Sequence, residues 1–196
     1  MAYRVGIPSA LMYYICYPMW KTFFDEIGIE VVNSGRTTKN ILDNGVREAL
    51  ADACVPVKLF FGHVMELKDN VDFLFIPRTV CLNGKTVYCP KFLGLPDMIR
   101  HSVENLPPII DVRMDTREGR FSLLKAYFEI GKFFGAEKRA VLMAYLKAKI
   151  KFLNYTRLLK KGFNPVEAIS LLDNPKIRLN RPSGLVIKFA VLGYPY

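Results

Sequence analysis

The chain has 196 residues, of which 51% are hydrophobic and 23% are charged, a composition that excludes a disordered or low-complexity protein. Charged residues interrupt every apolar stretch well before about 18 positions, so the sequence predicts no membrane-spanning helix. The net charge is +10, and the excess lies in residues 113–161, which hold 13 Lys and Arg against four Asp and Glu, whereas residues 1–112 are nearly neutral.

Residues 1–112 alternate short apolar strands with helices. Tyr3–Ile7 predicts the first strand, and Pro18 is expected to start a new helix that ends at Gly28, because proline suits the first helical turn. Further strands are expected at 29–33, 71–76 and 108–112, and further helices at 37–50, 56–68 and 96–105. Strands separated by helices predict an α/β fold, with a Rossmann-like, mainly parallel sheet covered by helices over residues 3–112.

Asn83-Gly84 interrupts this alternation after the third strand. Asn-Gly supplies the two positive-φ residues of a tight hairpin turn, so the sequence predicts a hairpin here. In its register Cys81 pairs with Thr86 and Arg78 pairs with Cys89, which directs Cys81 and Cys89 to opposite faces.

The basic segment, residues 113–184, has a different pattern. Apolar residues recur near helical spacing and predict long helices at 119–134 and 137–161 and a short one at 165–172. Leu142, Tyr145, Leu146 and Leu153 belong to this repeat.

The last residues predict one more strand, at 186–192. The sequence V-G-I-P after the first strand resembles L-G-Y-P here, which favours reading 185–196 as the first strand of a truncated second α/β lobe. Alternatively, the strand completes the first sheet. An apolar strand without a following helix also predicts a weak homo-oligomer.

Two of the four cysteines form the candidate site. Cys54 and Cys89 each stand just ahead of a proline and a lysine, outside regular structure. Backbone N–H groups at a helix start stabilise an anionic sulfur. If residues 51–55 climb the sheet, both cysteines reach the carboxyl edge, where open α/β sheets bind ligands. We therefore expect Cys54 and Cys89 to share a metal site.

The remaining candidates favour structural roles. Cys16 lies in an apolar helix and is expected to be buried, and His63 is expected to be a hydrogen-bonded structural histidine. No set of ligands predicts a closed zinc site, and no phosphate-loop or dinucleotide fingerprint is present. The first residues lack a secretory signal, and four cysteines are too few for a disulfide scaffold, so the sequence predicts a cytoplasmic protein.

The basic helices admit two interpretations. Lysines and arginines interleaved with Tyr145, Phe152 and Tyr155 are typical of nucleic-acid binding. The aromatic residues fall at helical spacing, however, so we favour a solvated face or a contact with an acidic protein over recognition of a specific nucleic acid.

Several ordered motifs resemble a known family. V-G-I-P, Y-Y-x-x-Y-P-x-W at 13–20, D-A-C-V-P-V-K at 52–58, G-H-V at 62–64, F-I-P-R-x-V at 75–80 and C-P-K-F-x-G-L-P-D at 89–97 look like the domain associated with CoA-substrate-specific enzyme activases. That domain is related to the subunits of 2-hydroxyacyl-CoA dehydratases. The resemblance covers residues 3–112 and the terminal strand.

The resemblance implies an iron–sulfur protein of anaerobes. In the related dehydratases, an ATP-driven activator passes an electron to a [4Fe-4S] cluster, and the reduced enzyme dehydrates an acyl-CoA through a radical. Cys54 and Cys89 match the cysteine positions of the family. Two cysteines are half of the usual ligand set, so a second lobe, a partner or non-protein groups must supply the rest. The resemblance implies as partners an activator or a dehydratase subunit, and acyl-CoA; the alternative is a cluster-free scaffold or CoA-binding module that docks an activator.

Overall fold

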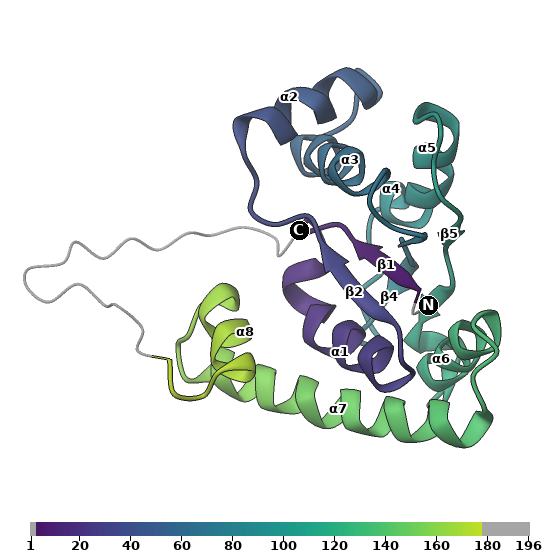
Figure 1. The fold of residues 1–196 in the computed structure, drawn as a ribbon, viewed down its shortest axis with the longest axis vertical. Helices are drawn as coiled ribbons and strands as arrows, with labels where there is room; N and C mark the ends of the chain where they lie inside the picture. Colours follow the sequence, from purple (N-terminus) through teal and green to yellow (C-terminus); the bar gives the residue numbers. More distant parts are fainter. Residues whose placement is uncertain (1–2, 178–196) are drawn as a thin grey trace, which may run out of the picture.

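The computed structural model describes residues 3–177 and is built around a parallel sheet (Figure 1). Its four strands, in spatial order, are β2 (Glu30–Asn33), β1 (Arg4–Ile7), β3 (Phe73–Phe75) and β5 (Ile109–Ile110). All three pairings are parallel. The α/β class and the parallel sheet expected from the sequence are therefore confirmed.

Two short strands prolong the β3–β5 pairing beyond the sheet. They are β4 (Arg78–Cys81) and β6 (Arg113–Asp115), which pair in parallel. Backbone hydrogen bonds bridge the two sheets, since Ile76 N–H donates to Ile110 O and Arg78 N–H to Val112 O, both at 3.1 Å. The strand pairing thus continues through residue 115, into the start of the basic segment.

The hairpin predicted at Asn83-Gly84 is wrong. The Asn83 side-chain carbonyl accepts the N–H groups of Lys85 and Thr86, at 2.9 and 2.8 Å, so the turn closes on a side chain. The returning chain forms no strand, although Tyr88 N–H donates to Val80 O of β4 at 2.9 Å. In the observed register Arg78 pairs with Arg113, and Cys81 with Asp115. The partner of β4 is a distant strand, which local turn chemistry does not reveal.

Helices make up most of the remaining chain. They are α1 (Tyr13–Glu26), α2 (Lys39–Glu48), α3 (Val55–Leu67), α4 (Pro90–Leu93), α5 (Leu95–Ser102), the 3₁₀ turn η1 (Thr116–Glu118), α6 (Ser122–Phe133), α7 (Lys138–Lys160) and α8 (Pro165–Asp173). The predicted helices are confirmed to within a few residues, except at Pro18. The strand predicted at 186–192 lies outside the described residues.

Pro18 lies inside α1 and does not start a helix. A proline has no N–H to offer the carbonyl four residues earlier, which here belongs to Tyr14. That carbonyl instead accepts a hydrogen bond from the hydroxyl of Tyr155 on α7. A tertiary contact thus replaces the missing helical bond, which explains why α1 continues.

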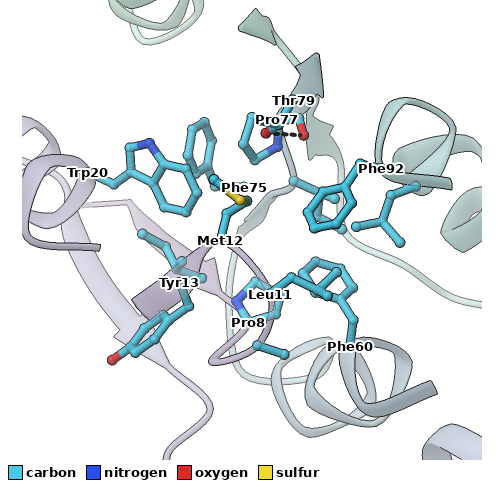
Figure 2. A pocket seen from close by; sticks show the side chains of 14 residues that line it. Pro8, Leu11, Met12, Tyr13, Trp20, Phe60, Phe75, Pro77, Thr79 and Phe92 are labelled. Atoms are coloured by element: carbon cyan, nitrogen blue, oxygen red, sulfur yellow. Dashed lines mark hydrogen bonds between the residues drawn. The ribbon is translucent and has the colours of Figure 1, made fainter. Parts of the chain in front are cut away.

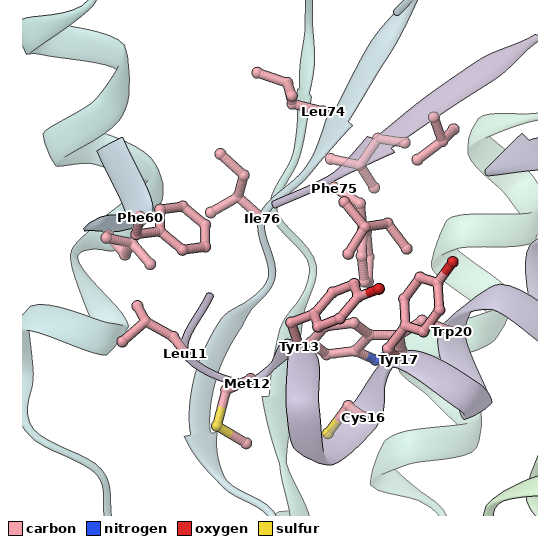
Figure 3. Close-up of a cluster of buried hydrophobic side chains, with 14 of the residues drawn as sticks. Leu11, Met12, Tyr13, Cys16, Tyr17, Trp20, Phe60, Leu74, Phe75 and Ile76 are labelled. Atoms are coloured by element: carbon pink, nitrogen blue, oxygen red, sulfur yellow. The ribbon is translucent and has the colours of Figure 1, made fainter. Parts of the chain in front are cut away.

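Side chains of β3 alternate between two helical layers (Figure 3). Phe75 points toward α1, where its ring centroid lies 5.1 Å from that of Trp20. Ile76, one position further, lies on the side of Phe60 from α3. Helices α1 and α3 therefore cover opposite faces of the sheet, as a parallel sheet requires.

Helix α7 packs across α1 and not directly on the sheet (Figure 1). Its buried side chains are mostly small: Val141, Ala144, Ala148 and Tyr155. Lys147 adds an ion pair with Glu26 of α1, at 2.6 Å. The repeat at Leu142, Leu146 and Leu153 does not face the core, since all three side chains are exposed. Within the described part of the chain, no helix has the length and apolar character needed to cross a membrane.

Candidate functional site

Cys54 and Cys89 occupy equivalent positions at two helix starts. Cys54 is the N-cap of α3 and Cys89 that of α4, both with extended backbone and a proline in the following turn. Both thiols are exposed. Lys91, two residues after Cys89, reaches Asp52, two residues before Cys54: its Nζ donates to the Asp52 carbonyl at 2.9 Å. The segments that carry the two cysteines therefore lie against each other.

The route of the chain to Cys54 differs from the expected climb along the sheet. Helices α2 and α3 form an antiparallel pair, in which Ile41 lies opposite Gly62 and Gly45 opposite Lys58. Residues 49–54 only join the adjacent ends of these helices. Further along α3, His63 contacts Ser34, which directly follows β2. The first turns of α3 therefore extend beyond the carboxyl edge and carry Cys54 about 13 Å along the helix from His63.

Two glycines allow this close helix pair. A Cβ atom on Gly62 would lie 1.9 Å from the backbone oxygen of Ile41, and a Cβ on Gly45 would lie 1.9 Å from that of Lys58. Only glycine fits at these two positions, because backbone atoms cannot move aside as a flexible side chain can. The helix that begins at Cys54 is thus held on a rigid support.

The other two cysteines are buried away from solvent. Cys16 lies on α1 beside Met12 (Figure 3), and burial raises the pKa of its thiol to about 12. Cys81 ends β4, where its sulfur accepts a hydrogen bond from the Thr116 hydroxyl at 3.7 Å and donates to the Asn83 side chain at 3.5 Å. Neither thiol is available to a ligand in solvent.

Residues 3–177 contain no group of three or more His, Cys, Asp or Glu side chains arranged to hold a metal ion. Cys54 and Cys89 are the two exposed cysteines of the chain. The described residues therefore offer two thiolates, which is half of the ligand set of a typical [4Fe-4S] cluster.

His63 is fully buried between the ends of the strands and α3. Its Nδ1 lies 2.8 Å from the Ser34 hydroxyl and its Nε2 lies 3.0 Å from that of Thr37. Ser34 Oγ also accepts the N–H of Ser9, at 2.9 Å, so one hydroxyl links the histidine to the β1 loop. In the neutral ring one nitrogen donates and the other accepts, and both have a hydroxyl partner. Burial lowers the pKa of His63 to about 4, and the ring is neutral at pH 7. The histidine joins α3 to the β1 and β2 loops.

Arg78, to which sequence reasoning assigned no role, binds two carboxylates. Its guanidinium forms a bidentate pair with Asp97 of α5, at 2.5 and 2.6 Å, and contacts Asp111 at 2.7 Å. Arg100 bonds both carboxylates from the other side. The hydrogen bonds from Arg78 hold the pKa of Asp97 well below its usual range. This cluster fixes α5, which carries Asp97 and Arg100, to the strands beside Arg78 and Asp111.

A small apolar cavity lies where β1 and β3 end (Figure 2). Its walls include Pro8, Met12, Trp20, Phe60 and Phe75, and its volume is about 20 Å³. This volume holds about one water molecule and no acyl chain. In this conformation the edge between β1 and β3 is a packed surface, and the accessible chemistry lies at Cys54 and Cys89.

Comparison with known proteins identifies a family to which the chain is similar. A family model described as the CoA enzyme activase uncharacterised domain matches residues 4–196. No curated protein and no solved structure matches the chain. The family expected from the sequence motifs is confirmed, and the match extends through the basic segment.

Proposed function

Because the chain belongs to the CoA enzyme activase uncharacterised domain family, we propose that it is the iron–sulfur-binding domain of a system that resembles 2-hydroxyacyl-CoA dehydratases and their activators. In this proposal it takes part in ATP-driven, low-potential electron transfer that leads to radical dehydration of an acyl-CoA. Its partners are an ATP-dependent activator or a dehydratase subunit, and it works in the cytoplasm, where thiols stay reduced.

The contact between Lys91 and Asp52 carries the proposal. It joins the two segments that contain the exposed cysteines, each of which caps the start of a helix. A complete [4Fe-4S] ligand set does not fit within residues 3–177, which hold two exposed thiols. Cys54 and Cys89 would therefore provide two ligands, and a partner protein would provide the others. The exposure of both thiols supports a shared site of this kind, since a partner can approach them.

Phenylarsine oxide tests whether the two thiols converge. The arsenic forms bonds to two neighbouring sulfurs and releases water, so tight uptake requires a close thiol pair. We expect one equivalent to bind the native chain and uptake to be lost in Cys54→Ser and in Cys89→Ser. Cys81→Ser is the matched control and should bind like the native chain. Equal uptake by all four proteins, or none by the native chain, would exclude the pair.

Anaerobic reconstitution with iron and sulfide then tests the cluster. The chain alone should retain iron poorly, and retention should rise when it is reconstituted together with a dehydratase subunit of the same system. This gain should vanish in the Cys54→Ser/Cys89→Ser double variant. A double variant that retains as much iron as the native pair of proteins would contradict a role for these cysteines.

The second candidate is a cluster-free scaffold or CoA-binding module that docks an activator. The docking part is favoured by one observation: apolar side chains on the outer face of α7 are exposed. The thiol and iron experiments distinguish the two candidates, because a cluster-free scaffold would need neither Cys54 nor Cys89.

A further inference from the structure

The outer face of α7 carries an unusual concentration of exposed apolar side chains. Met143, Leu146, Ile150 and Leu153 are 56%, 45%, 59% and 47% exposed. Leu142 lies beside them and is also exposed. Figure 1 shows α1 against the inner side of α7 and no described helix against the outer side. Within residues 3–177 each of these side chains therefore keeps about half of its surface accessible.

Their spacing is that of a helix-packing seam. The steps from Met143 to Leu146, Ile150 and Leu153 are three, four and three residues, which is the alternation of a and d positions in a heptad repeat. The four residues span about 15 Å of helix. Two heptads are too short for an independent coiled coil but match one docked helix.

The charge around the seam indicates which kind of partner can bind there. Helix α7 contains seven Lys and Arg and no Asp or Glu. Arg157 and Lys160 continue the heptad spacing beyond Leu153, and Lys149 precedes Ile150 on the flank. Lys147 is bound to Glu26, and in the described part of the chain it is the only cation of α7 in an ion pair with a carboxylate. The remaining cations favour an acidic partner.

From these observations we infer that the Met143–Leu153 face of α7 docks an amphipathic helix of another protein, with an apolar seam and acidic flanks. A second copy of this chain is disfavoured as the partner. Two α7 helices, packed parallel or antiparallel, would bring their cations against each other. Residues 178–196 carry three Lys and Arg and no Asp or Glu, so their charge also opposes this face. The inference is independent of the thiol site.

The geometry also favours a helix over an anionic membrane or a nucleic acid. Interfacial helices insert Trp, Phe and Leu side chains, and the exposed seam contains neither Trp nor Phe. Tyr155 is buried and Tyr145 packs against Tyr127, with ring centroids 5.2 Å apart, so neither ring offers a free stacking surface.

A peptide binding experiment tests the inference with the full chain. The probe is a designed 21-residue helical peptide (about six turns) with Leu at a and d and Glu at e and g, labelled for fluorescence anisotropy. We expect binding that weakens with salt and falls at least about tenfold in Leu146→Glu/Ile150→Glu. Val46→Glu, at an exposed apolar position on α2, is the matched control and should bind like the native chain.

Several outcomes would overturn the inference. They are equal binding of a scrambled peptide, equal binding by Leu146→Glu/Ile150→Glu, tighter binding to phosphatidylserine vesicles or DNA than to the peptide, and native self-association that the same double variant abolishes. Circular dichroism and urea unfolding of each variant exclude misfolding as the cause. The Cys54→Ser/Cys89→Ser variant should bind the peptide normally, so failure here and failure of the thiol site are distinguishable.

Discussion

Helices α2 and α3 on one side of the molecule, and α7 on the other, use their surfaces in opposite ways. The α2–α3 pair approaches so closely that backbone meets backbone at Gly45 and Gly62. Helix α7 packs on α1 with small residues and turns its large apolar side chains outward. Burial in this fold therefore follows the distance between backbones more than the hydrophobicity of a helical stripe. Where backbones are close, small residues are inside, and the bulky ones remain for a partner.

Gly62→Ala should disrupt the close contact between α2 and α3 and should have the largest effect on stability. The new methyl group would lie 1.9 Å from the backbone oxygen of Ile41, so the helices must separate. We expect a loss of about 3 kcal/mol in the free energy of unfolding, despite the better helix propensity of alanine. Urea unfolding measures this loss. Gly94→Ala, where the nearest atom is 3.6 Å away, is the control, and an equal loss there would contradict the argument.

Acid should lower the free energy of unfolding, because His63 on α3 is buried in its neutral form. The folded pKa is about 4 and the ordinary value is 6.5, so below pH 6.5 the unfolded chain binds a proton that the folded chain refuses. The contribution of neutral His63 to the stability of the folded chain is complete above pH 6.5 and is lost as the pH falls toward 4. We expect a loss of about 2 kcal/mol between pH 7 and pH 5. In His63→Gln this slope should flatten, and an unchanged slope would assign the effect to another group.

Tyr155→Phe examines the buried side of α7. The substitution removes the hydroxyl that donates a hydrogen bond to the Tyr14 carbonyl. Pro18 cannot supply a donor in its place, because proline has no backbone N–H. Leaving this part-buried carbonyl unpaired should cost about 1–2 kcal/mol in the free energy of unfolding. In Pro18→Ala/Tyr155→Phe the backbone N–H that the first substitution restores can serve that carbonyl, so part of the loss should return. A double variant no more stable than Tyr155→Phe would disprove this account of Pro18.

Ile150→Ser should have the smallest effect, because Ile150 is exposed. We expect the free energy of unfolding to change by no more than about 0.5 kcal/mol. Val141→Ser, a similar change on the buried side of the same helix, should cost about 2 kcal/mol. If both variants lose the same stability, the two faces of α7 do not differ as described.

Local chemistry determined many of the elements. Gly28 ends α1 at a φ of +81°, as its sequence position predicts. Thr38 caps α2 through a hydrogen bond from Ile41 N–H, and threonine is a residue type that favours this position. Proline in the first turn located the starts of α3 and α5. These signals act within a few residues, so they can be read without knowing the fold. The position of Cys54 at the start of α3 follows from the same rules, whereas the helix start at Cys89 was not predicted.

Contacts between distant residues decided the rest. The Tyr155 hydroxyl keeps α1 helical through Pro18, β6 replaces the expected hairpin partner of β4, and the contact of α7 with α1 buries alanines in place of leucines. Likewise, only the folded chain brings Lys91 to Asp52 and Ser34 to His63. The sequence by itself determined most of the helices and strands, although not α4 or β6, and which residues carry thiols and charge. The tertiary structure decided which faces are covered, because a side chain's burial depends on the backbone opposite it, and residues far apart in the sequence supply that backbone.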